Sequence, residues 1–462
     1  MGEAVFWLSI RELAAAYRTL ELSPVELTNA ILLRIDRLDA QLRTFVTITK
    51  ERALADARES EERFVRKRPL GLLDGIPIGL KDIIETAGIL TTGQSRLRGD
   101  HVPKRDAAVV ARVAASGAIL VGKLNTHEFA MGGPSYDLPI SPAQNPWRRG
   151  FYTGGSSSGA GAALAARLVF GAIATDTAGS IRLPSSLCGV TGLKPTYDLV
   201  SRVGVFPLAP SLDHVGPIAR SADDCRIILD AISSRQSHQP EFPEPVQPAL
   251  RHDTSKPLSG LRIGVVKWED DIHIGPDVQR AHDAAAAILS QLGAAMAPVE
   301  FSFLRESHTA VMIVMLSEAA AIYGTDLREK RQLFGRSFVN RVLPGAFLTA
   351  TDYVNASRLR GRIVGRAQVL FERFDLLLLP TTSAPSIPIE QVSPIAFFQS
   401  PSFTALANLI GYPAVNVCCG FSDGLPLGLQ LVGKPFHDHQ LLLAAQAYQE
   451  ATPWLDQFPP IE

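Results

Sequence analysis

The sequence is poor in cysteine, nearly neutral in net charge and without long apolar runs. Four cysteines occur among 462 residues, and their spacing fits neither a metal site nor a disulfide framework, which indicates a reducing compartment. The formal net charge of −1 gives no electrostatic reason to expect nucleic acid or an acidic membrane as a partner. No apolar run reaches the length of about 18 residues that a membrane span needs. The N-terminal segment MGEAVFWLSI does not resemble a signal peptide. These absences predict a soluble, cytoplasmic protein.

The composition of the sequence is typical of a globular protein with a large core. Hydrophobic residues make up 46% of the chain and charged residues 20%. The clearest helix start is Ser23-Pro24-Val25-Glu26, where Ser23 is the expected N-cap and Glu26 closes a capping box. A second helix is expected at 105–118, capped by Asp106. Further helices are expected at 277–294 and 353–374, and strands at 72–84, 118–125, 261–268 and 375–382. This alternation predicts an α/β fold with a central sheet covered by helices.

The stretch FYTGGSSSGAGAALAA, residues 151–166, permits three interpretations. A flexible linker is disfavoured because the stretch leads directly into an apolar, alanine-rich segment. A phosphate-binding loop requires lysine where Ala160 stands. A nucleophile elbow on Ser157 matches G-x-S-x-G, but NPWRRGFYT before it is not an apolar strand. The triad partners of that elbow would also have to be Asp213 and His214, which are adjacent rather than on separate loops.

A second glycine–serine segment follows at 175–186, directly after an expected strand. Its small residues, Thr177-Ala178-Gly179-Ser180, can form a tight turn that directs several backbone N–H groups to one point. Such a turn can stabilise the oxyanion of a tetrahedral intermediate in acyl transfer. Ser180 at its end is then a candidate nucleophile.

A serine nucleophile needs a base that takes its proton. Among ten histidines, His127 and His214 are the best candidates, although neither lies in a setting that marks it as a base. Lys81 lies in the apolar stretch GIPIGLKDII, where burial would favour the neutral amine. The sequence alone leaves both a buried neutral lysine and a solvated surface lysine open at this position.

Together these segments resemble the amidase signature family over nearly the whole chain. The motifs that carry the resemblance are GIPIGLKD, VGKLNTHEFAMGG, NPW, TGGSSSGAGAA, ATDTAGSIRLPSSLCGVTGLKPT, GVFPLAPSLDHVGPIAR and GLPLGLQLVGKPF. The fold that the resemblance implies is α/β: a single domain with a large twisted mixed β-sheet sandwiched by helices. The expected parts of this domain, residues 1–462, are an N-terminal helical segment (1–65), a signature core (70–230), a surface connection (233–257) and a C-terminal substrate-shaping part (260–462).

The resemblance also implies a Ser–Ser–Lys catalytic triad. Ser180 is then the nucleophile that forms the acyl-enzyme, Ser156 bridges and relays the proton, and Lys81 is the general base. The family places its bridging serine after a cis peptide bond, expected here at Gly155–Ser156. The elbow on Ser157 is the competing assignment.

The resemblance further assigns an oxyanion hole and the residues around it. The expected donors are the backbone N–H groups of Thr177, Ala178, Gly179 and Ser180. This chain departs from the family at Ala178, where a second glycine is usual, and we expect a modest shift of the hole rather than loss of activity. Asp176 and Arg182 are expected to brace the loop by hydrogen bonds.

The reaction implied is hydrolysis of an amide C–N bond with no metal and no organic cofactor. The family shapes its pocket with the loop at 131–139, so Met131, Gly132 and Gly133 are the expected substrate contacts. The segments at 339–350 and 393–408 are apolar and rich in phenylalanine, which predicts either a pocket for an aryl group or simple core packing.

Four functional hypotheses follow. The leading one is a stand-alone amidase acting on anilides or on aryl or aliphatic amides, with carbamates (a urethanase activity) and esters also accessible. The alternative is the glutaminase subunit of a tRNA-dependent amidotransferase, which needs partner subunits and a polar, charged pocket. A catalytically dead binding protein and an elbow esterase on Ser157 are the others. The expected partner is a small-molecule amide or carbamate; a homodimer is left open, and neither nucleic acid nor a membrane is expected.

Overall fold

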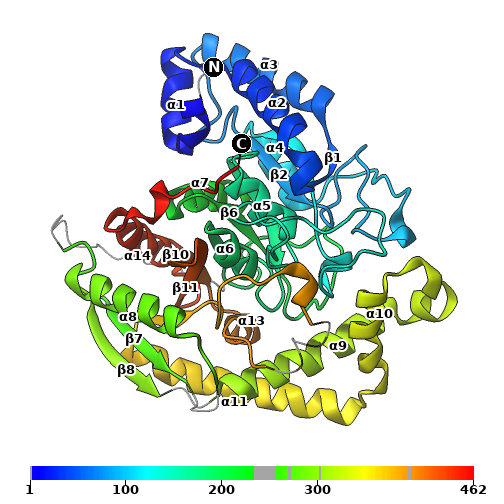
Figure 1. Ribbon diagram of the computed structural model, residues 1–462, viewed down its shortest axis with the longest axis vertical. Coiled ribbons are helices and arrows are strands. Elements are labelled where there is room, and N and C mark those ends of the chain that lie inside the picture. The colour runs from blue at the N-terminus through cyan, green and yellow to red at the C-terminus, as the bar shows by residue number, and fades with distance from the viewer. Residues whose placement is uncertain are drawn as a thin grey trace, which may run out of the picture.

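The computed structural model describes residues 3–233, 256–268, 272–300, 303–393 and 400–461, together with residues 395 and 398. At its centre is an 11-stranded mixed sheet with strand order β1-β3-β2-β4-β6-β5-β10-β11-β9-β7-β8, and helices lie on both of its faces (Figure 1). The predicted fold class is therefore confirmed. The polar segment predicted as a surface connection, 233–257, lies almost entirely outside the described residues.

The sheet consists of short strands that are mostly buried along their whole length. The strands are β1 Phe45–Ile48, β2 Pro77–Lys81, β3 Ile119–Leu124, β4 Gly171–Asp176, β5 Thr191–Lys194, β6 His214–Ala219, β7 Arg262–Lys267, β8 Ala295–Glu300, β9 Leu376–Pro380, β10 Ala414–Ser422 and β11 Leu425–Gly433. The pairs β2–β3, β2–β4, β7–β8 and β7–β9 are parallel. Strands with both faces covered, such as β2 and β4, carry no alternation of polar residues because no position meets water.

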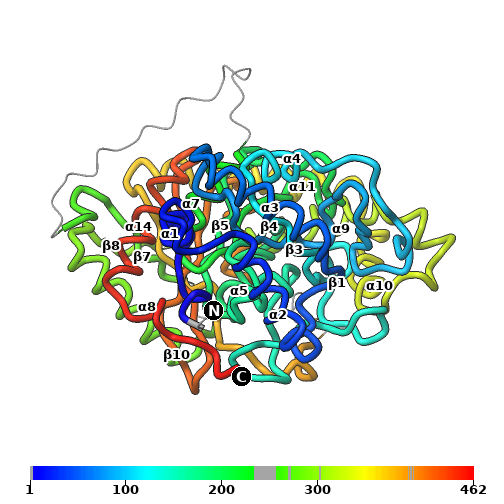
Figure 2. The backbone as a smooth tube through the Cα atoms, turned by 90° about the horizontal axis from the view of Figure 1, so that it is seen from above, coloured from blue at the N-terminus to red at the C-terminus, as the bar shows by residue number. Residues whose placement is uncertain are grey.

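The helices surround this sheet. They are α1 Ile10–Thr19, α2 Pro24–Leu42, α3 Lys50–Val65, α4 Ala108–Ala115, α5 Ser158–Ala165, α6 Arg182–Cys188, α7 Ala222–Ile232, α8 Pro276–Gln291, α9 Leu304–Glu329, α10 Arg336–Val342, α11 Ala350–Arg373, α13 Ala405–Ile410 and α14 Asp438–Glu450. Short 3-10 turns are η1 Glu3–Trp7, η2 Arg96–Arg98, η3 Glu128–Ala130, η4 Arg331–Leu333, η5 Leu343–Phe347, η6 Ile389–Gln391 and η7 Pro453–Asp456. The two chain ends lie close together in both views (Figures 1 and 2). The ring centroids of Trp7, near the N-terminus, and Phe458, near the C-terminus, are 3.8 Å apart.

Two local predictions have different outcomes. Ser23 caps α2 with a complete capping box to Glu26, as predicted. The cap predicted at Asp106 is wrong. The N-cap of α4 is Ala107, without a side-chain hydrogen bond, and Asp106 Oδ1 instead accepts from the Ala87 N–H at 2.7 Å. The Asp106 carboxylate accepts a hydrogen bond from a loop instead of from the first turn of the helix. The spacing of residues along the sequence does not show such a competing donor.

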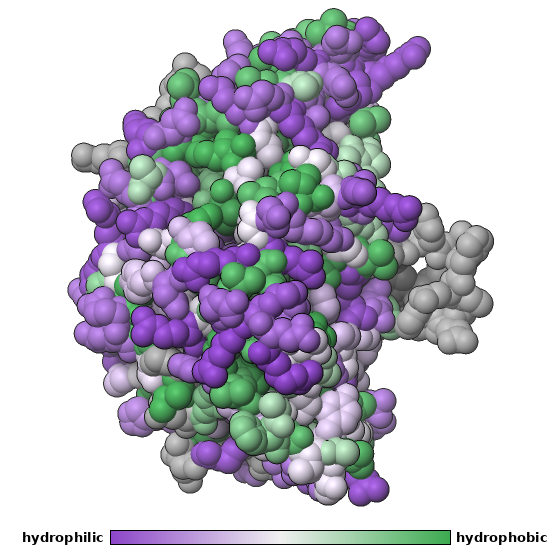
Figure 3. Space-filling model, turned by 90° about the vertical axis from the view of Figure 1, so that its right-hand side faces the viewer, coloured by the Kyte–Doolittle hydropathy of each residue, from purple (hydrophilic) through white to green (hydrophobic). Residues whose placement is uncertain are grey.

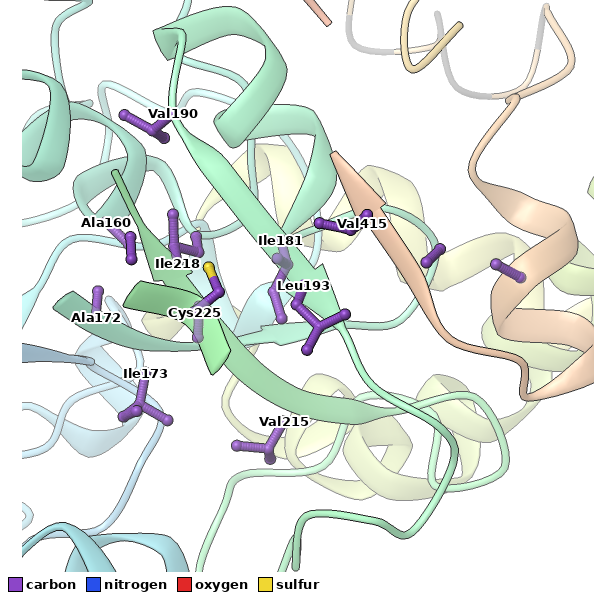
Figure 4. Packing of buried hydrophobic residues seen from close by; sticks show 14 of the residues in the cluster. Ala160, Ala172, Ile173, Ile181, Val190, Leu193, Val215, Ile218, Cys225 and Val415 are labelled. Carbon is purple, nitrogen blue, oxygen red and sulfur yellow. The ribbon is translucent and has the colours of Figure 1, made fainter. Parts of the chain in front are cut away.

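Small residues allow the central helices to approach the sheet closely. Every residue of α5 is buried, and a Cβ at Gly159 would overlap the Thr44 carbonyl oxygen. Figure 4 shows Ala160 of α5, Ile218 of β6 and Cys225 of α7 gathered in this core. The alanine-rich composition that follows the triple serine is therefore a packing requirement of the segment that carries Ser156.

One helix among the described residues is long and apolar enough to cross a membrane by length and composition, namely α9. Its apolar side chains, Val311, Met315 and Ala319 among them, are buried in the protein core. Figure 3 shows the face of the molecule on the α10 side, where hydrophilic and hydrophobic residues are intermixed. The apolar character of α9 is thus explained by core packing.

Candidate active site

Lys81 ends the central strand β2 and is completely buried, with 0% of its surface exposed. Its Nζ lies 2.8 Å from Ser156 Oγ and 2.8 Å from Thr175 Oγ1. Burial lowers the pKa of this amine to about 7, although the negative charges of Asp176 and Asp213 partly oppose the shift. At neutral pH a large fraction of Lys81 is therefore an uncharged amine able to accept a proton.

Ser156 is placed at the entrance to α5 by an unusual backbone. The Gly155–Ser156 peptide bond is cis. The Ser156 carbonyl accepts from the His127 N–H at 3.0 Å, and the next residue, Ser157, donates its N–H to the Ser180 carbonyl at 3.3 Å. The second of these bonds joins the two serine-bearing segments, and the first ties Ser156 to the segment that carries His127.

Ser180 lies between β4 and α6 and shares a cavity with Ser156. This inner cavity, as we call it, has a volume of about 280 Å³, and Ser180 is partly exposed to it. With Lys81 behind Ser156, the structure brings the three predicted catalytic residues together from three separate elements. Ser157 is fully buried, and its hydroxyl donates to the Thr175 carbonyl at 3.3 Å. That orientation removes the support for an elbow on Ser157.

The segment that carries Ser180 is held by a buried carboxylate. Asp176 accepts from the N–H groups of Gly179 (2.7 Å) and Ile181 (3.1 Å) and pairs with Arg182 Nε at 3.0 Å. Burial alone would raise the pKa of Asp176, but the Arg182 guanidinium, the Lys194 charge and the hydrogen bond from Asn408 together outweigh it and hold that pKa well below its usual range. Arg182 also donates to Asn408 Oδ1 at 2.6 Å. The predicted bracing role of Asp176 and Arg182 is confirmed.

The backbone of the same segment explains the alanine at 178. Gly179 has φ of +128°, and a Cβ there would overlap Thr404 Oγ1, so glycine is required at 179. Ala178 has no positive φ, so its Cβ is tolerated without strain. Because the Gly179 N–H already donates to Asp176, one of the four predicted oxyanion donors is engaged. Within the described residues, no hydrogen bond engages the N–H groups of Ala178 and Ser180.

His127, one of the two candidate histidine bases, is a wall of the inner cavity. Its ring stacks on Tyr152 with centroids 6.1 Å apart. Burial, together with the positive charges of Arg341 and Lys81, lowers the pKa of His127 to about 3, so the ring is neutral. A base with that pKa binds a proton poorly near pH 7.

His214 lies beside a second cavity of about 230 Å³ on the other side of the Thr175–Thr177 segment. Its Nδ1 is 2.7 Å from the Leu212 carbonyl oxygen. The neighbouring Asp213 accepts from Thr177 Oγ1 at 2.6 Å, and burial raises the pKa of this carboxyl to about 6. Asp213 therefore holds the segment that carries Ser180 through Thr177, whereas the Nδ1 contact of His214 is with the preceding Leu212 carbonyl.

The inner cavity is more polar than the sequence predicted. Met131 and Gly132 line it, whereas Gly133 lines an adjoining outer cavity. The hydroxyl-bearing residues of the inner cavity beyond the triad are Tyr152, Thr177, Thr381, Thr382, Ser383, Ser393, Ser400 and Ser402, and its larger apolar residues are Met131, Leu183, Leu208, Met315, Val392 and Phe403. No aspartate or glutamate is among the described residues that line it.

The two phenylalanine-rich segments, predicted to form either an aryl pocket or core, supply one phenylalanine and one arginine to the wall of the inner cavity. Residues 339–350 supply Arg341 to the cavity wall, while Phe347 is 79% exposed on the surface. From 393–408, Phe403 is the phenylalanine that lines the cavity. Arg341 was not predicted, because the apolar composition of 339–350 points to its phenylalanine. Helical spacing is the signal that could have found it: Ser337, Asn340 and Arg341 share one face of a helix.

The side chains around the site do not form a cluster typical of metal binding. Across the described ranges, no group of three or more His, Cys, Asp or Glu side chains is arranged to hold a metal ion. The four cysteines are buried free thiols.

Comparison with known proteins agrees with this geometry. Residues 26–442 match the family model described as Amidase. A glutamyl-tRNA(Gln) amidotransferase subunit from Methylococcus capsulatus is 38% identical, over 98% of this chain and 98% of that protein. Among solved structures, a chain of an inhibitor-bound vestigial protein complex, described as revealing the evolutionary origins of an s-triazine catabolic enzyme, is 30% identical (TM-score 0.87; 96% of this chain and 98% of that chain). The peptide amidase of Stenotrophomonas maltophilia is 29% identical (TM-score 0.83; 98% of each chain).

Proposed function

The chain belongs to the amidase signature family, a family of hydrolases acting on amide C–N bonds, and from this premise we propose that it is a stand-alone amidase for aliphatic amides. The observation that carries the proposal is the 2.8 Å contact between Lys81 Nζ and Ser156 Oγ, with the amine buried and its pKa near 7. A neutral amine beside a hydroxyl is what a serine nucleophile without histidine needs.

In the proposed acylation step, Ser180 Oγ attacks the amide carbonyl carbon. Its proton passes to Ser156, whose own proton moves to the lone pair of Lys81. The negative oxygen of the tetrahedral intermediate is stabilised by the N–H groups of Ala178 and Ser180. As the C–N bond breaks, the proton returns from Lys81 through Ser156 to the departing nitrogen.

Deacylation uses the same groups in the same order. Water attacks the acyl carbon and loses a proton through Ser156 to Lys81. The tetrahedral intermediate collapses, the C–O bond to Ser180 breaks, and the proton returns to Ser180 Oγ. The products are a carboxylic acid and the free amine or ammonia, and the enzyme regains its starting protonation.

The walls of the inner cavity, which mix apolar and polar side chains, suit an aliphatic acyl chain that carries a polar or anionic substituent. About 280 Å³ is available, and hydroxyl groups and the Arg341 guanidinium offer hydrogen bonds to an oxygen-rich or anionic substituent. Because the described lining has no carboxylate, an ammonium group on the acyl chain would lose hydration without gaining an ion pair. Anilides, carbamates and esters remain chemically accessible to the same nucleophile.

The second candidate is a glutaminase subunit of a tRNA-dependent amidotransferase. Arg341 supplies a cation that could pair with the α-carboxylate of glutamine, and the M. capsulatus relative bears the name of an amidotransferase subunit. The α-ammonium of glutamine, however, would meet a lining without carboxylates among the described residues. We therefore rank this function second.

The test is hydrolysis of a matched panel by the purified chain. The panel contains a primary aliphatic amide, an amide with a carboxylate on its acyl chain, an anilide, an aryl carbamate, an ester and glutamine. We expect turnover of the first two, abolished in Ser180→Ala and retained in Ser157→Ala, which is the matched control. Turnover that survives Ser180→Ala would overturn the mechanism, and glutamine as the single substrate would move the glutaminase function to first place.

A further inference from the structure

A second, larger cavity adjoins the inner cavity and takes no part in the proposed mechanism. This outer chamber has a volume of about 450 Å³ and lies between the loop at 133–137 and helix α10. Arg341, Val392 and Ser393 line both spaces. A molecule that reaches from Ser180 into the outer chamber must therefore pass the Arg341 guanidinium.

One face of α10 forms a wall of the outer chamber. Ser337, Asn340 and Arg341 line it and stand at positions i, i+3 and i+4 of the helix, so they share that face. The opposite face carries Phe338 and Val342, both completely buried in the core. The apolar face fixes the helix to the protein, and this anchoring holds the polar face in a constant position.

The facing wall is also held in place before any ligand binds. The Gly133 N–H donates to Ser337 Oγ at 3.0 Å, and the Arg336 N–H donates to Asp137 Oδ2 at 2.9 Å. Ser135 Oγ donates to the other oxygen of Asp137 at 2.6 Å. These bonds join the loop to α10 and satisfy both oxygens of the Asp137 carboxylate.

The chamber offers two features to a ligand. Its charged lining residues are Arg336, Arg341 and Asp137, two cations against one anion, so the net charge is +1; Arg336 Nε lies 3.6 Å from Asp137 Oδ2, and the Arg336 side chain is 90% exposed. Tyr136 lines the same space with 61% of its surface exposed, which leaves its ring available for contact. An aromatic face and a positive net charge together suit a planar group that ends in an anion.

We propose that the outer chamber binds the distal part of an extended acyl group, with a planar ring against Tyr136 and a terminal carboxylate facing Arg336. This inference rests on the proposed amidase function and names its substrate class: amides of long acyl chains that end in an aryl carboxylate. The aliphatic part of the chain occupies the inner cavity, with the scissile carbonyl at Ser180.

The test uses primary amides, so that the leaving group is always ammonia. Three substrates are compared: butanamide, a hexanamide with a terminal phenyl ring, and the same phenyl amide with a para carboxylate. We expect kcat/KM of the wild type to rise by about tenfold from the first to the third. Tyr136→Ala should raise KM for both aryl amides by about tenfold and leave butanamide unchanged, whereas Tyr136→Phe should behave as the wild type.

The charge is tested separately by Arg336→Gln. This variant should remove the advantage of the carboxylate over the plain phenyl amide, while Arg280→Gln, an exposed arginine on α8, should not. Equal kcat/KM for butanamide and the aryl amides in the wild type, or equal effects of Tyr136→Ala on all three, would overturn the proposal.

A binding measurement separates this proposal from the proposed function. Calorimetry with the intact Ser180→Ala protein measures the affinity for each amide without turnover. Tighter binding of the aryl carboxylate amide, lost in Ser180→Ala/Tyr136→Ala, supports the chamber even if no primary amide is hydrolysed. Hydrolysis of butanamide together with equal affinity for all three amides would uphold the amidase and refute the chamber.

Discussion

The single residue with the largest expected effect on rate is Lys81, and its protonation state sets the pH dependence. Burial lowers the pKa of this amine to about 7, so it is protonated and inactive as a base below that pH and neutral above it. We predict that kcat/KM rises with pH through an apparent pKa near 7 and then reaches a plateau. The measurement is kcat/KM of one amide across about pH 5 to 9.

The control for this pH profile is Lys81→Met, which keeps an apolar side chain of similar length. Turnover should fall by about three orders of magnitude or more while the melting temperature stays close to that of the wild type. A flat profile in the wild type, or substantial turnover in a folded Lys81→Met protein, would remove Lys81 from the mechanism.

Ala178 permits a second prediction for a single residue. Because its backbone does not have a positive φ, a glycine there gains no conformational relief. We predict that Ala178→Gly changes kcat/KM by less than about threefold and lowers the free energy of unfolding by about 0.5–1 kcal/mol, since glycine has more freedom in the unfolded chain. Steady-state kinetics and urea denaturation measure the two effects. An increase in stability would show that the alanine is strained.

A site residue could be predicted from the sequence when it lies in a recognisable motif. Lys81, Ser156 and Ser180 each lie in a motif of small or apolar residues, so a family resemblance could identify them. Arg341 lies on a seven-residue helix, and only the packing of Phe338 decides which face meets the cavity. Which face of the helix meets the cavity is decided by tertiary packing. The composition of the segment alone predicts phenylalanine, not arginine, as the residue that lines the pocket.

Among the elements, the segment between β4 and α6 depends on one ion pair. Asp176 and Arg182 are both completely buried, and removing one charge leaves the other without its partner. We predict that Asp176→Asn lowers the free energy of unfolding by about 3–5 kcal/mol and reduces kcat more than it raises KM, because the side-chain NH2 that replaces one carboxylate oxygen can no longer accept from the Gly179 or the Ile181 N–H group.

The matched control is Asp375→Asn, in a partly exposed carboxylate paired with Arg262 and Lys434. That substitution should cost about 1 kcal/mol or less and leave kcat unchanged. Thermal melts and initial rates of both variants make the comparison. Equal losses of kcat in the two variants would mean that Asp176 acts only through general stability.

A helix or strand could be predicted from the sequence where its local residue pattern agrees with the way the element packs in the fold. The cap of α2 and the buried strands β2, β3 and β9 follow from capping chemistry and apolar runs. Strand β1, Phe45–Ile48, was not predicted, because four residues with mixed burial leave little pattern in a sequence. Asp106 was assigned to the wrong partner because its acceptor role was decided by a loop distant in sequence.

For the whole molecule, the continuous sheet predicts a single cooperative unit. Strands of the N-terminal half, β1 to β6, and of the C-terminal half, β7 to β11, meet through the β5–β10 pair. We predict one unfolding transition that coincides for all probes. Far-ultraviolet circular dichroism, fluorescence of Trp147 in the N-terminal half and fluorescence of Trp268 beside β7, each in a single-tryptophan variant, measure it. Two separate transitions would indicate two domains.

The contacts of Arg182 also determine when activity can begin during synthesis. Lys81, Ser156 and Ser180 leave the ribosome early, but the segment that carries Ser180 is held by Thr404, Asn408 and Gln430 near the end of the chain. A nascent chain therefore carries a complete set of reactive groups without the scaffold that aligns them. We therefore expect a chain that stops before Thr404 to be folded incorrectly around Ser180 and to hydrolyse no amide.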